Sequence, residues 1–183
     1  MRIRLLAVPL AAAALFAAAP TAAAEPSPLY NLVDAVAQRL QTAENVAAFK
    51  WLNGGPINDP PRVEVVLDTV AAEATAAQVD AMYVRLVFQD QINANEGIQY
   101  TRFGQWKLDP AVAPVTAADL SASRDTINQF NKTIVNEISL QRDTLLGPTC
   151  QQALEGAEQA VIHNRGLDPM YVQALNVATE NYC

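Results

Sequence analysis

Residues 28–53, PLYNLVDAVAQRLQTAENVAAFKWLN, contain the pattern that decides the fold. Apolar side chains recur through this stretch at steps of three and four, which is the spacing of one face of an α-helix. Pro28 suits a first helical turn, and Gly54, Gly55 and Pro56 end the pattern. The stretch therefore predicts one long amphipathic helix over residues 28–53. The apolar positions are Leu29, Leu32, Val33, Val36, Leu40, Ala43, Ala47 and Trp51.

Similar helical periodicity continues along the rest of the chain, whereas the strict alternation typical of strands is rare. It predicts further helices at about residues 61–78, 80–107, 121–147, 149–164 and 169–182. Ser121 and Ser123 are both good N-caps for the helix that begins there. At 183 residues the chain is long enough for one domain. We therefore expect a single all-α domain of about six helices over residues 25–183.

The first 24 residues have the features of an export signal. Two arginines precede an apolar run, and Ala22, Ala23 and Ala24 fit the small-x-small rule for cleavage. We expect cleavage after Ala24 and a secreted or periplasmic mature protein. The alternative, an uncleaved membrane anchor, is disfavoured because the apolar run is short for a span of roughly 20 residues. No later segment is apolar enough to cross a bilayer, so no membrane association is expected after cleavage.

Export also bears on Cys150 and Cys183, the only two cysteines of the chain. Disulfides persist outside the cytosol, so a bond between these cysteines is expected. Such a crosslink would stabilise the fold by about 3–4 kcal/mol in the chain-entropy description. Two free thiols and an intermolecular bridge remain the alternatives.

Composition excludes several classes of function. The formal net charge is -7, which disfavours nucleic acid as a partner, since its binders carry a basic surplus. One histidine and two cysteines are too few ligands for an ordinary four-ligand zinc site. The single histidine also argues against several histidine-based catalytic schemes.

Polar residues occupy positions of two predicted helices where core residues are expected. In the helix over 80–107, one face begins apolar and becomes polar without changing direction at 100° per residue. A buried polar group is costly without a partner, so the C-terminal half of this face must meet a polar cavity, a ligand or solvent. Its residues are Val84, Phe88, Gln91, Asn95, Ile98, Gln99 and Arg102. Arg39 and Lys50 likewise share a face of the first helix, about 16 Å apart along its axis. Two solvated cations are the alternative interpretation.

Four separated blocks carry a resemblance to a known family. They are LVDAVAQRL with VAAFKW (32–40 and 46–51), INDPPRVE (57–64), YVRLVFQDQINANEGIQYTRFGQWKLDP (83–110) and DLSASR (119–124). With the export signal and the two cysteines, this order resembles the exported subclass of the all-helical chorismate mutases. The similarity covers about residues 29–183, and it is specific as a set rather than block by block.

The resemblance implies a chorismate mutase II-like fold and a chemistry that needs no metal or cofactor. These isomerases convert chorismate to prephenate by a [3,3] Claisen rearrangement, a step of aromatic amino-acid biosynthesis. The enzyme holds the dicarboxylate substrate as a compact diaxial chair and stabilises negative charge on the breaking ether oxygen. Arginine forks match carboxylates, so a few convergent cations suffice even in an acidic protein.

Three residues would serve the reaction directly if the resemblance holds. Lys50 and Gln99 would donate hydrogen bonds to the ether oxygen. Arg124 would take the place of an arginine that another subunit supplies in the small dimeric subclass. The active site would then lie within one protomer, with one site per protomer in a homodimer.

Three more residues would bind the substrate on the same grounds, namely Arg39 and Arg62 as cations and Asn95 as a neutral donor. One position departs from the family, because Val66 stands where we expect a glutamine that binds the substrate hydroxyl. That contact is then lost, made by backbone, or taken by the loop of Asn58 and Asp59.

Other interpretations remain open from the residues alone. Arg62 and Arg124 could be exposed charges near helix starts, and Asn95 and Gln99 could be solvated. At the level of function, the alternatives are an exported helical binding protein with a decayed mutase site, or a structural or host-interaction protein. Retention of the four cations favours the enzyme.

Overall fold

The apolar face predicted in residues 28–53 is buried from Leu29 to Ala47, and Trp51 is partly buried, in the computed structural model, which describes residues 26–183. The stretch forms two helices, α1 (Tyr30–Gln41) and α2 (Ala43–Asn53), so the prediction of one helix was wrong at Thr42. The hydroxyl of Thr42 donates to the carbonyl oxygen of Arg39 at 2.6 Å. A threonine that bonds back onto its own helix in this way bends it, which explains the break.

The other elements agree with the predicted all-α class, and the described residues contain no strand. They are α3 (Pro60–Ala76), α4 (Ala81–Leu108), the short 3-10 helix η1 (Pro110–Val112), α5 (Leu120–Leu140), α6 (Arg142–Leu145), α7 (Cys150–Arg165) and α8 (Pro169–Thr179). Two of the about six predicted helices are each divided in the structure. The predicted helix over 121–147 ends at Leu140, where no glycine or proline marks the interruption, and α6 follows it.

Aspartates cap the N-termini of four α-helices. The side chain of Asp119 accepts from the backbone N–H of Ser121 at 2.9 Å, so Asp119 is the N-cap of α5 and the predicted caps Ser121 and Ser123 were wrong. An aspartate oxygen satisfies an N–H group that has no partner inside the helix. The caps of α3, α4 and α8 are Asp59, Asp80 and Asp168.

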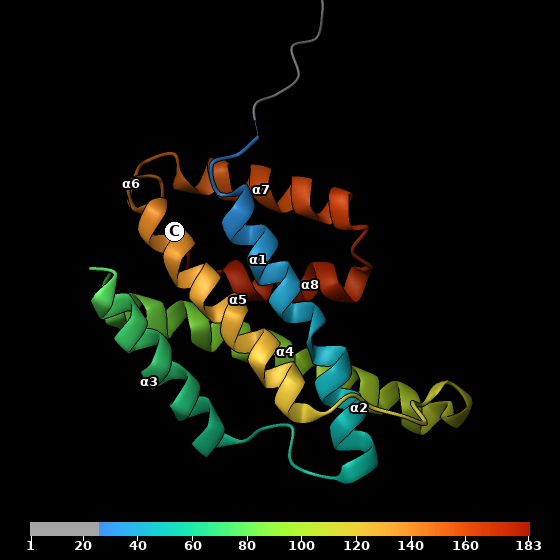
Figure 1. Cartoon of the computed structure of the whole chain (residues 1–183). Helices are drawn as coiled ribbons and strands as arrows, with labels where there is room; N and C mark the ends of the chain where they lie inside the picture. The colour runs from blue at the N-terminus through green and yellow to red at the C-terminus, as the bar shows by residue number, and fades with distance from the viewer. Residues whose placement is uncertain (1–25) are drawn as a thin grey trace, which may run out of the picture.

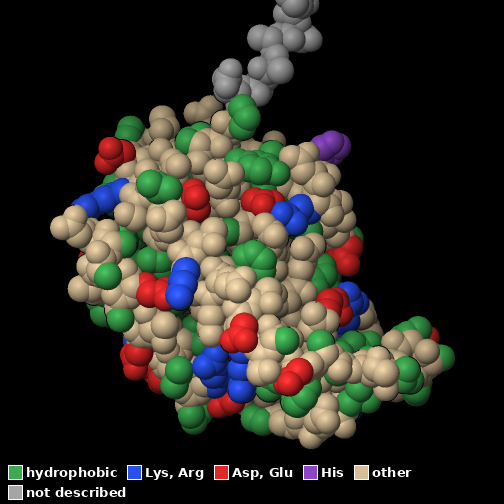
Figure 2. Space-filling view, in the orientation of Figure 1, with side chains coloured by type: hydrophobic (Ala, Val, Ile, Leu, Met, Phe, Trp, Pro, Cys, Tyr) green, Lys and Arg blue, Asp and Glu red, His purple; other side chains and the backbone are tan. Residues whose placement is uncertain are grey.

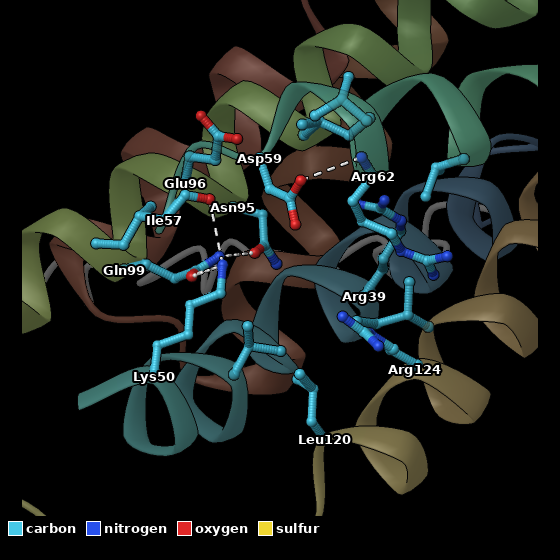
Figure 3. Close-up of a pocket in the computed structure, with 15 residues that line it drawn as sticks. Arg39, Lys50, Ile57, Asp59, Arg62, Asn95, Glu96, Gln99, Leu120 and Arg124 are labelled. Atoms are coloured by element: carbon cyan, nitrogen blue, oxygen red, sulfur yellow. Dashed lines mark hydrogen bonds between the residues drawn. The ribbon is translucent and has the colours of Figure 1, made fainter. Parts of the chain in front are cut away.

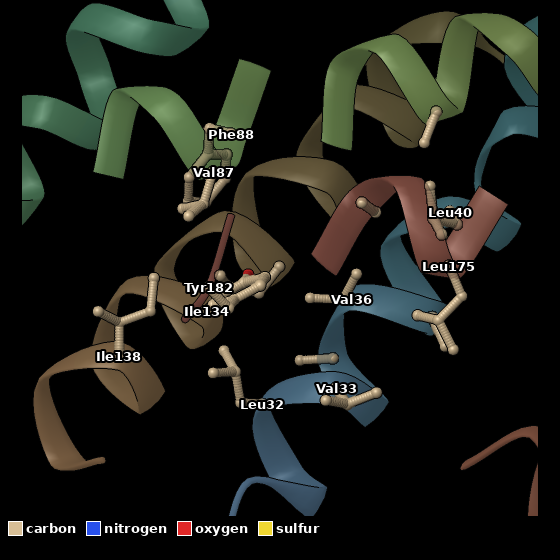
Figure 4. Close-up of a cluster of buried hydrophobic side chains, with 14 of the residues drawn as sticks. Leu32, Val33, Val36, Leu40, Val87, Phe88, Ile134, Ile138, Leu175 and Tyr182 are labelled. Carbon is tan, nitrogen blue, oxygen red and sulfur yellow. The ribbon is translucent and has the colours of Figure 1, made fainter. Parts of the chain in front are cut away.

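The helices pack around α1 and α4 (Figure 1). Helix α1 contacts α5, α7 and α8, and α4 contacts α2, α3 and α8. Their facing side chains form one apolar core, and Tyr182 from the end of the chain is 1% exposed within it (Figure 4). The core therefore holds α1, α4 and α5 together next to the site described below.

A disulfide joins Cys150 at the start of α7 to Cys183, with their Cα atoms 5.8 Å apart. The predicted intramolecular bond is confirmed, and no free cysteine remains in the described part of the chain. Gly166 turns the chain between α7 and α8 with φ +58°, a left-handed conformation that favours glycine. The bridge thus ties the two ends of a helical hairpin.

An arm formed by the end of α4, η1 and the following loop projects from the body (Figure 1). Its side chains are largely hydrophobic in the space-filling view (Figure 2), and Leu108, Val112 and Val115 are 90%, 60% and 89% exposed. Within residues 26–183, no helix combines the length and apolar character needed to span a membrane. The predicted export signal over 1–24 and its cleavage after Ala24 lie outside the described residues.

Candidate active site

One cavity collects all seven residues that the sequence predicted for the site (Figure 3). It lies among α1 to α5, and its empty volume, including the open mouth, is about 720 Å³. The predicted residues in its wall are Arg39, Lys50, Asp59, Arg62, Asn95, Gln99 and Arg124. The other wall residues are Val46, Ile57, Val63, Val66, Ile92, Glu96, Leu120 and Ile127.

The cavity contains four cations that come from four different helices. Figure 3 shows Arg39, Arg62 and Arg124 at one side, facing Lys50 across the space. Within the described chain, none of these four is within 4.0 Å of a carboxylate oxygen. Elsewhere in the fold, arginines 85, 102 and 165 each form an ion pair. The cavity cations are therefore free to meet an anionic ligand.

Lys50 is fixed at one side of the cavity by neutral acceptors. Its Nζ donates to the carbonyl oxygen of Ile57 at 3.2 Å and to Oε1 of Gln99 at 3.1 Å. Burial lowers the pKa of Lys50, while Glu96 and Asp59 act in the opposite direction. Desolvation makes this ammonium a stronger electrostatic partner for negative charge inside the cavity.

The amide of Gln99 is oriented by its contacts on both sides. Its oxygen accepts from Lys50, and its Nε2 donates to Oδ1 of Asn95 at 2.7 Å. An amide nitrogen has two N–H groups, so one remains for a ligand. Gln99 is 3% exposed, which suppresses competition from water. The polar part of the α4 face, with Asn95 and Gln99, thus lines a cavity. The sequence had left a polar cavity, a ligand and solvent as alternatives for this face.

Arg39 is a buried cation held by neutral groups. It is 4% exposed, its Nε donates to Oδ1 of Asn131 at 2.8 Å, and its Nη1 donates to the carbonyl oxygen of Gln91 at 3.4 Å. Its guanidinium also lies 5.6 Å from the centre of the Phe88 ring. Burial lowers the pKa of Arg39 to about 10, so the side chain stays charged at neutral pH.

Arg62 comes from the first turn of α3, and Arg124 comes from the second turn of α5. Burial and the positive charge of Arg124 both lower the pKa of Arg62, as expected for two guanidinium groups at one mouth. Asp59 caps α3 by accepting from the backbone N–H of Arg62 at 3.2 Å, and its carboxylate points into the cavity in Figure 3. Figure 2 shows Lys and Arg side chains gathered low on this face, near the start of α5.

The departure at Val66 is visible in the cavity wall. Val66 is 8% exposed and contributes apolar surface where a polar contact was expected. Glu64 points away and pairs with Arg85 at 2.8 Å. Asn58, half of the proposed substitute loop, is exposed and donates to Oε2 of Glu96 at 3.1 Å. Only Asp59 of that loop lines the cavity.

Sequence reasoning missed two polar residues of the site, Glu96 and Asn131. Glu96 lies outside the polar face of α4, so the wheel that found its neighbours gave no signal for it. Asn131 is 3% exposed among the apolar positions of α5 and could have been found as a polar residue on a core face. Arg102 shares the predicted face but leaves the cavity, because it pairs with Glu44 at 2.5 Å.

The arrangement suits a dianion. Four cations and two carboxylates, Asp59 and Glu96, give the wall a formal charge of +2. The wall contains no hydroxyl, thiol or imidazole side chain, so pairs of serine or cysteine with histidine are absent from it. The described residues also contain no group of three or more His, Cys, Asp or Glu placed to hold a metal ion. Binding, orientation and electrostatic stabilisation are what these residues can supply.

Known proteins are similar to this chain in sequence and in fold. The family described as Chorismate mutase type II matches residues 30–100. A protein named secreted chorismate mutase from Mycolicibacterium smegmatis is 50% identical over 157 residues, which cover 86% of this chain and 87% of that protein. A protein of the same name from Mycobacterium tuberculosis is 44% identical, with 86% and 79% covered.

Solved structures agree with these relatives. The crystal structure of a chorismate mutase from Burkholderia thailandensis superposes with a TM-score of 0.81 at 31% identity, covering 86% of this chain and 99% of that one. The two sequence relatives are matched over most of their length, and the all-helical fold is shared. The chain therefore belongs to the chorismate mutase type II family.

Proposed function

We propose that this chain is an exported chorismate mutase that converts chorismate to prephenate within a single protomer. The observation that carries the proposal is the cavity with four cations that have no carboxylate partner, because chorismate is a dicarboxylate. The names of the two mycobacterial relatives support both the activity and the export.

The reaction needs no covalent bond to the protein. In a [3,3] rearrangement the ether C–O bond breaks while a new C–C bond forms, and electrons move around a six-membered ring without an external proton. The three arginines hold the two carboxylates and so select the compact conformer in which the reacting carbons meet. Bidentate arginine forks are suited to this task because they fix direction as well as position.

Lys50 and Gln99 would stabilise the transition state from the opposite side. The breaking ether oxygen gains negative charge, and both side chains place N–H donors there in a water-poor environment. The bond from Lys50 to the oxygen of Gln99 turns the amide nitrogen toward Asn95 and the cavity. The amide is thus set as a donor before the substrate binds.

The substrate hydroxyl would be bound by Asp59 instead of a residue at position 66. One carboxylate oxygen of Asp59 accepts from the backbone N–H of Arg62, which leaves the other for a hydroxyl donor. Val66 supplies only apolar contact. A binding protein with a decayed site is favoured by Val66 alone and is opposed by the retained cations.

The proposal is tested by the fall in ultraviolet absorbance of chorismate on adding the mature protein, with prephenate identified by chromatography. Arg124→Ala serves as the matched comparison, because Arg124 is exposed and its removal should weaken turnover while preserving the helical fold. A folded wild-type protein that leaves chorismate unchanged would overturn the proposal and would favour the hypothesis of a binding protein.

We also propose a homodimer in which each protomer keeps its own complete site. The exposed apolar arm with Leu108, Val112 and Val115 supports self-association, since large exposed apolar patches mark interaction surfaces. Light scattering of the mature protein should give twice the protomer mass. Leu108→Lys should shift the protein toward monomer with activity per chain retained, because the site residues all lie in one chain.

A further inference from the structure

The floor of the cavity is a polar network inside an otherwise apolar core. Asn131 from α5 and Gln91 from α4 meet Arg39 from α1, and Gln91 Nε2 donates to the hydroxyl of Tyr182 at 3.0 Å. All four residues are at most 4% exposed. Polar groups at this depth cost stability even when they are bonded, so their place in the core calls for a reason other than packing.

The network around Arg39 is neutral. Its Nε meets an amide oxygen and its Nη1 meets a backbone carbonyl oxygen. Less deeply buried arginines are bound by carboxylates instead. Arg165 pairs with Asp34, and Arg102 pairs with Glu44. A carboxylate in place of the Asn131 amide would make as many hydrogen bonds and would also offset the buried charge. The neutral partner therefore leaves the charge of Arg39 available.

The same contacts fix the direction of the guanidinium. Two of its five N–H groups are used on the protein side, and the remaining ones are left for the cavity that Arg39 lines. A planar fork held along one edge presents its other edge in a set orientation. Tyr182 next to the disulfide holds the Gln91 side of the network within the core (Figure 4).

We propose that Asn131 is a positioning residue, a buried neutral acceptor that aims Arg39 at a substrate carboxylate without neutralising it. This inference rests on the proposed function, in which Arg39 binds one carboxylate of chorismate. Asn131 itself touches no substrate, because it lies behind Arg39 and outside the cavity wall.

The test is Asn131→Asp, which keeps an oxygen that accepts from the Nε–H of Arg39 and adds a negative charge there. The internal ion pair should compete with the substrate, so KM for chorismate should rise about tenfold or more while kcat changes much less. The melting temperature should stay level or rise, because the buried cation gains a counter-charge. A purely structural asparagine would give the opposite pattern, with lower stability and an unchanged KM.

Asn136→Asp is the matched control, since Asn136 is exposed on the same helix and the change in charge is the same. Its KM should equal that of the wild type. Prephenate binding by calorimetry gives a second readout that needs no turnover, and its Kd should rise in Asn131→Asp only. If Asn131→Asp does not fold, Asn131→Ser, which is neutral and too short to reach Nε, should still weaken prephenate binding.

The outcomes separate this inference from the function on which it rests. An active wild type with a raised KM in Arg39→Ala, but unchanged KM and prephenate affinity in Asn131→Asp, overturns the positioning role alone. A wild type that neither converts chorismate nor binds prephenate overturns both. Equal losses in Asn131→Asp and Asn136→Asp would show a general charge effect and also overturn the role of Asn131.

Discussion

Replacing Gln99 by glutamate should make catalysis depend on pH. An amide donates a hydrogen bond to the ether oxygen at any ordinary pH, whereas a carboxyl group donates only when protonated. The ionised form would place negative charge beside an oxygen that gains negative charge in the transition state. It would also pair with the ammonium of Lys50, which now lies 3.1 Å from the Gln99 oxygen, and divert that donor.

The size of the effect follows from these contacts. Loss of one preorganised donor to a developing anion costs about 10²–10³ in kcat, so Gln99→Glu should be at least about 100-fold slower at pH 8. Toward acid the rate should recover as the carboxyl protonates. Burial at position 99 raises the pKa of that carboxyl and Lys50 lowers it, so the direction of the change is predicted rather than its midpoint.

The assay is a paired profile of kcat/KM against pH for the two proteins. As far as Gln99 is concerned, kcat/KM of the wild type should be nearly constant between about pH 5 and 8, because an amide does not titrate there. The rate should fall at alkaline pH as Lys50 loses its proton. This fall should come at a lower pH than for an ordinary lysine, because burial lowers the pKa of Lys50. Gln99→Leu should be slow at every pH, and Gln105→Glu, at an exposed position of the same helix, should follow the wild type. A wild-type profile in Gln99→Glu would refute the contact between Gln99 and the ether oxygen.

Three further predictions test other parts of the site and fold. Arg124→Ala should lose about tenfold to a few-hundredfold in kcat/KM, because a charged hydrogen bond is worth about 1.5–3 kcal/mol. Thermal unfolding should not change, because Arg124 is exposed. Wild-type kinetics in this variant would rule out a site within one chain. Val66→Gln should leave KM unchanged or raise it, because Asp59 already binds the hydroxyl and Val66 is buried in the wall, whereas a severalfold lower KM in steady-state kinetics would show that the hydroxyl lacks a partner in the wild type. Replacing Cys150 and Cys183 by alanine should lower the free energy of unfolding in urea by about 3–4 kcal/mol. The value of kcat/KM should stay near that of the wild type, since neither residue lines the cavity. Alkylatable thiols in the native exported protein would contradict the bridge.

Periodicity predicted which faces of the helices are buried, but it could not predict which residues meet across helices. The face of α4 that turns polar at Gln91 was visible in the sequence, and Asn95 and Gln99 do line the cavity. Asn131 lies 92 residues from Arg39, and no spacing rule connects an amide on one helix to a guanidinium on another. Such pairs depend on packing angles, which a single sequence does not contain.

Helix ends show a second limit of the same kind. The sequence DLSAS offers Asp119, Ser121 and Ser123 as caps of similar strength, and local preference alone does not decide among them. The bend at Thr42 arises from a hydroxyl that donates to the Arg39 carbonyl oxygen. Threonine does not form this bond in every helix, so its presence alone does not predict a bend. The resemblance to the family suggested the roles of the residues, whereas the structure shows how five helices, α1 to α5, bring them together.

The charge of the molecule illustrates why local arrangement decides the function. The whole chain has a formal net charge of -7, which by itself argues against binding an anion. At physiological ionic strength, exposed charges are screened beyond about 8 Å, so distant carboxylates contribute little inside the cavity. Within the cavity wall the balance is reversed to +2, and the desolvated cations Arg39 and Lys50 act at short range. An acidic surface therefore coexists with a site for a dicarboxylate, because ion pairs compensate Arg85, Arg102 and Arg165 outside the cavity, whereas in the described chain the four arginine and lysine side chains within it have none.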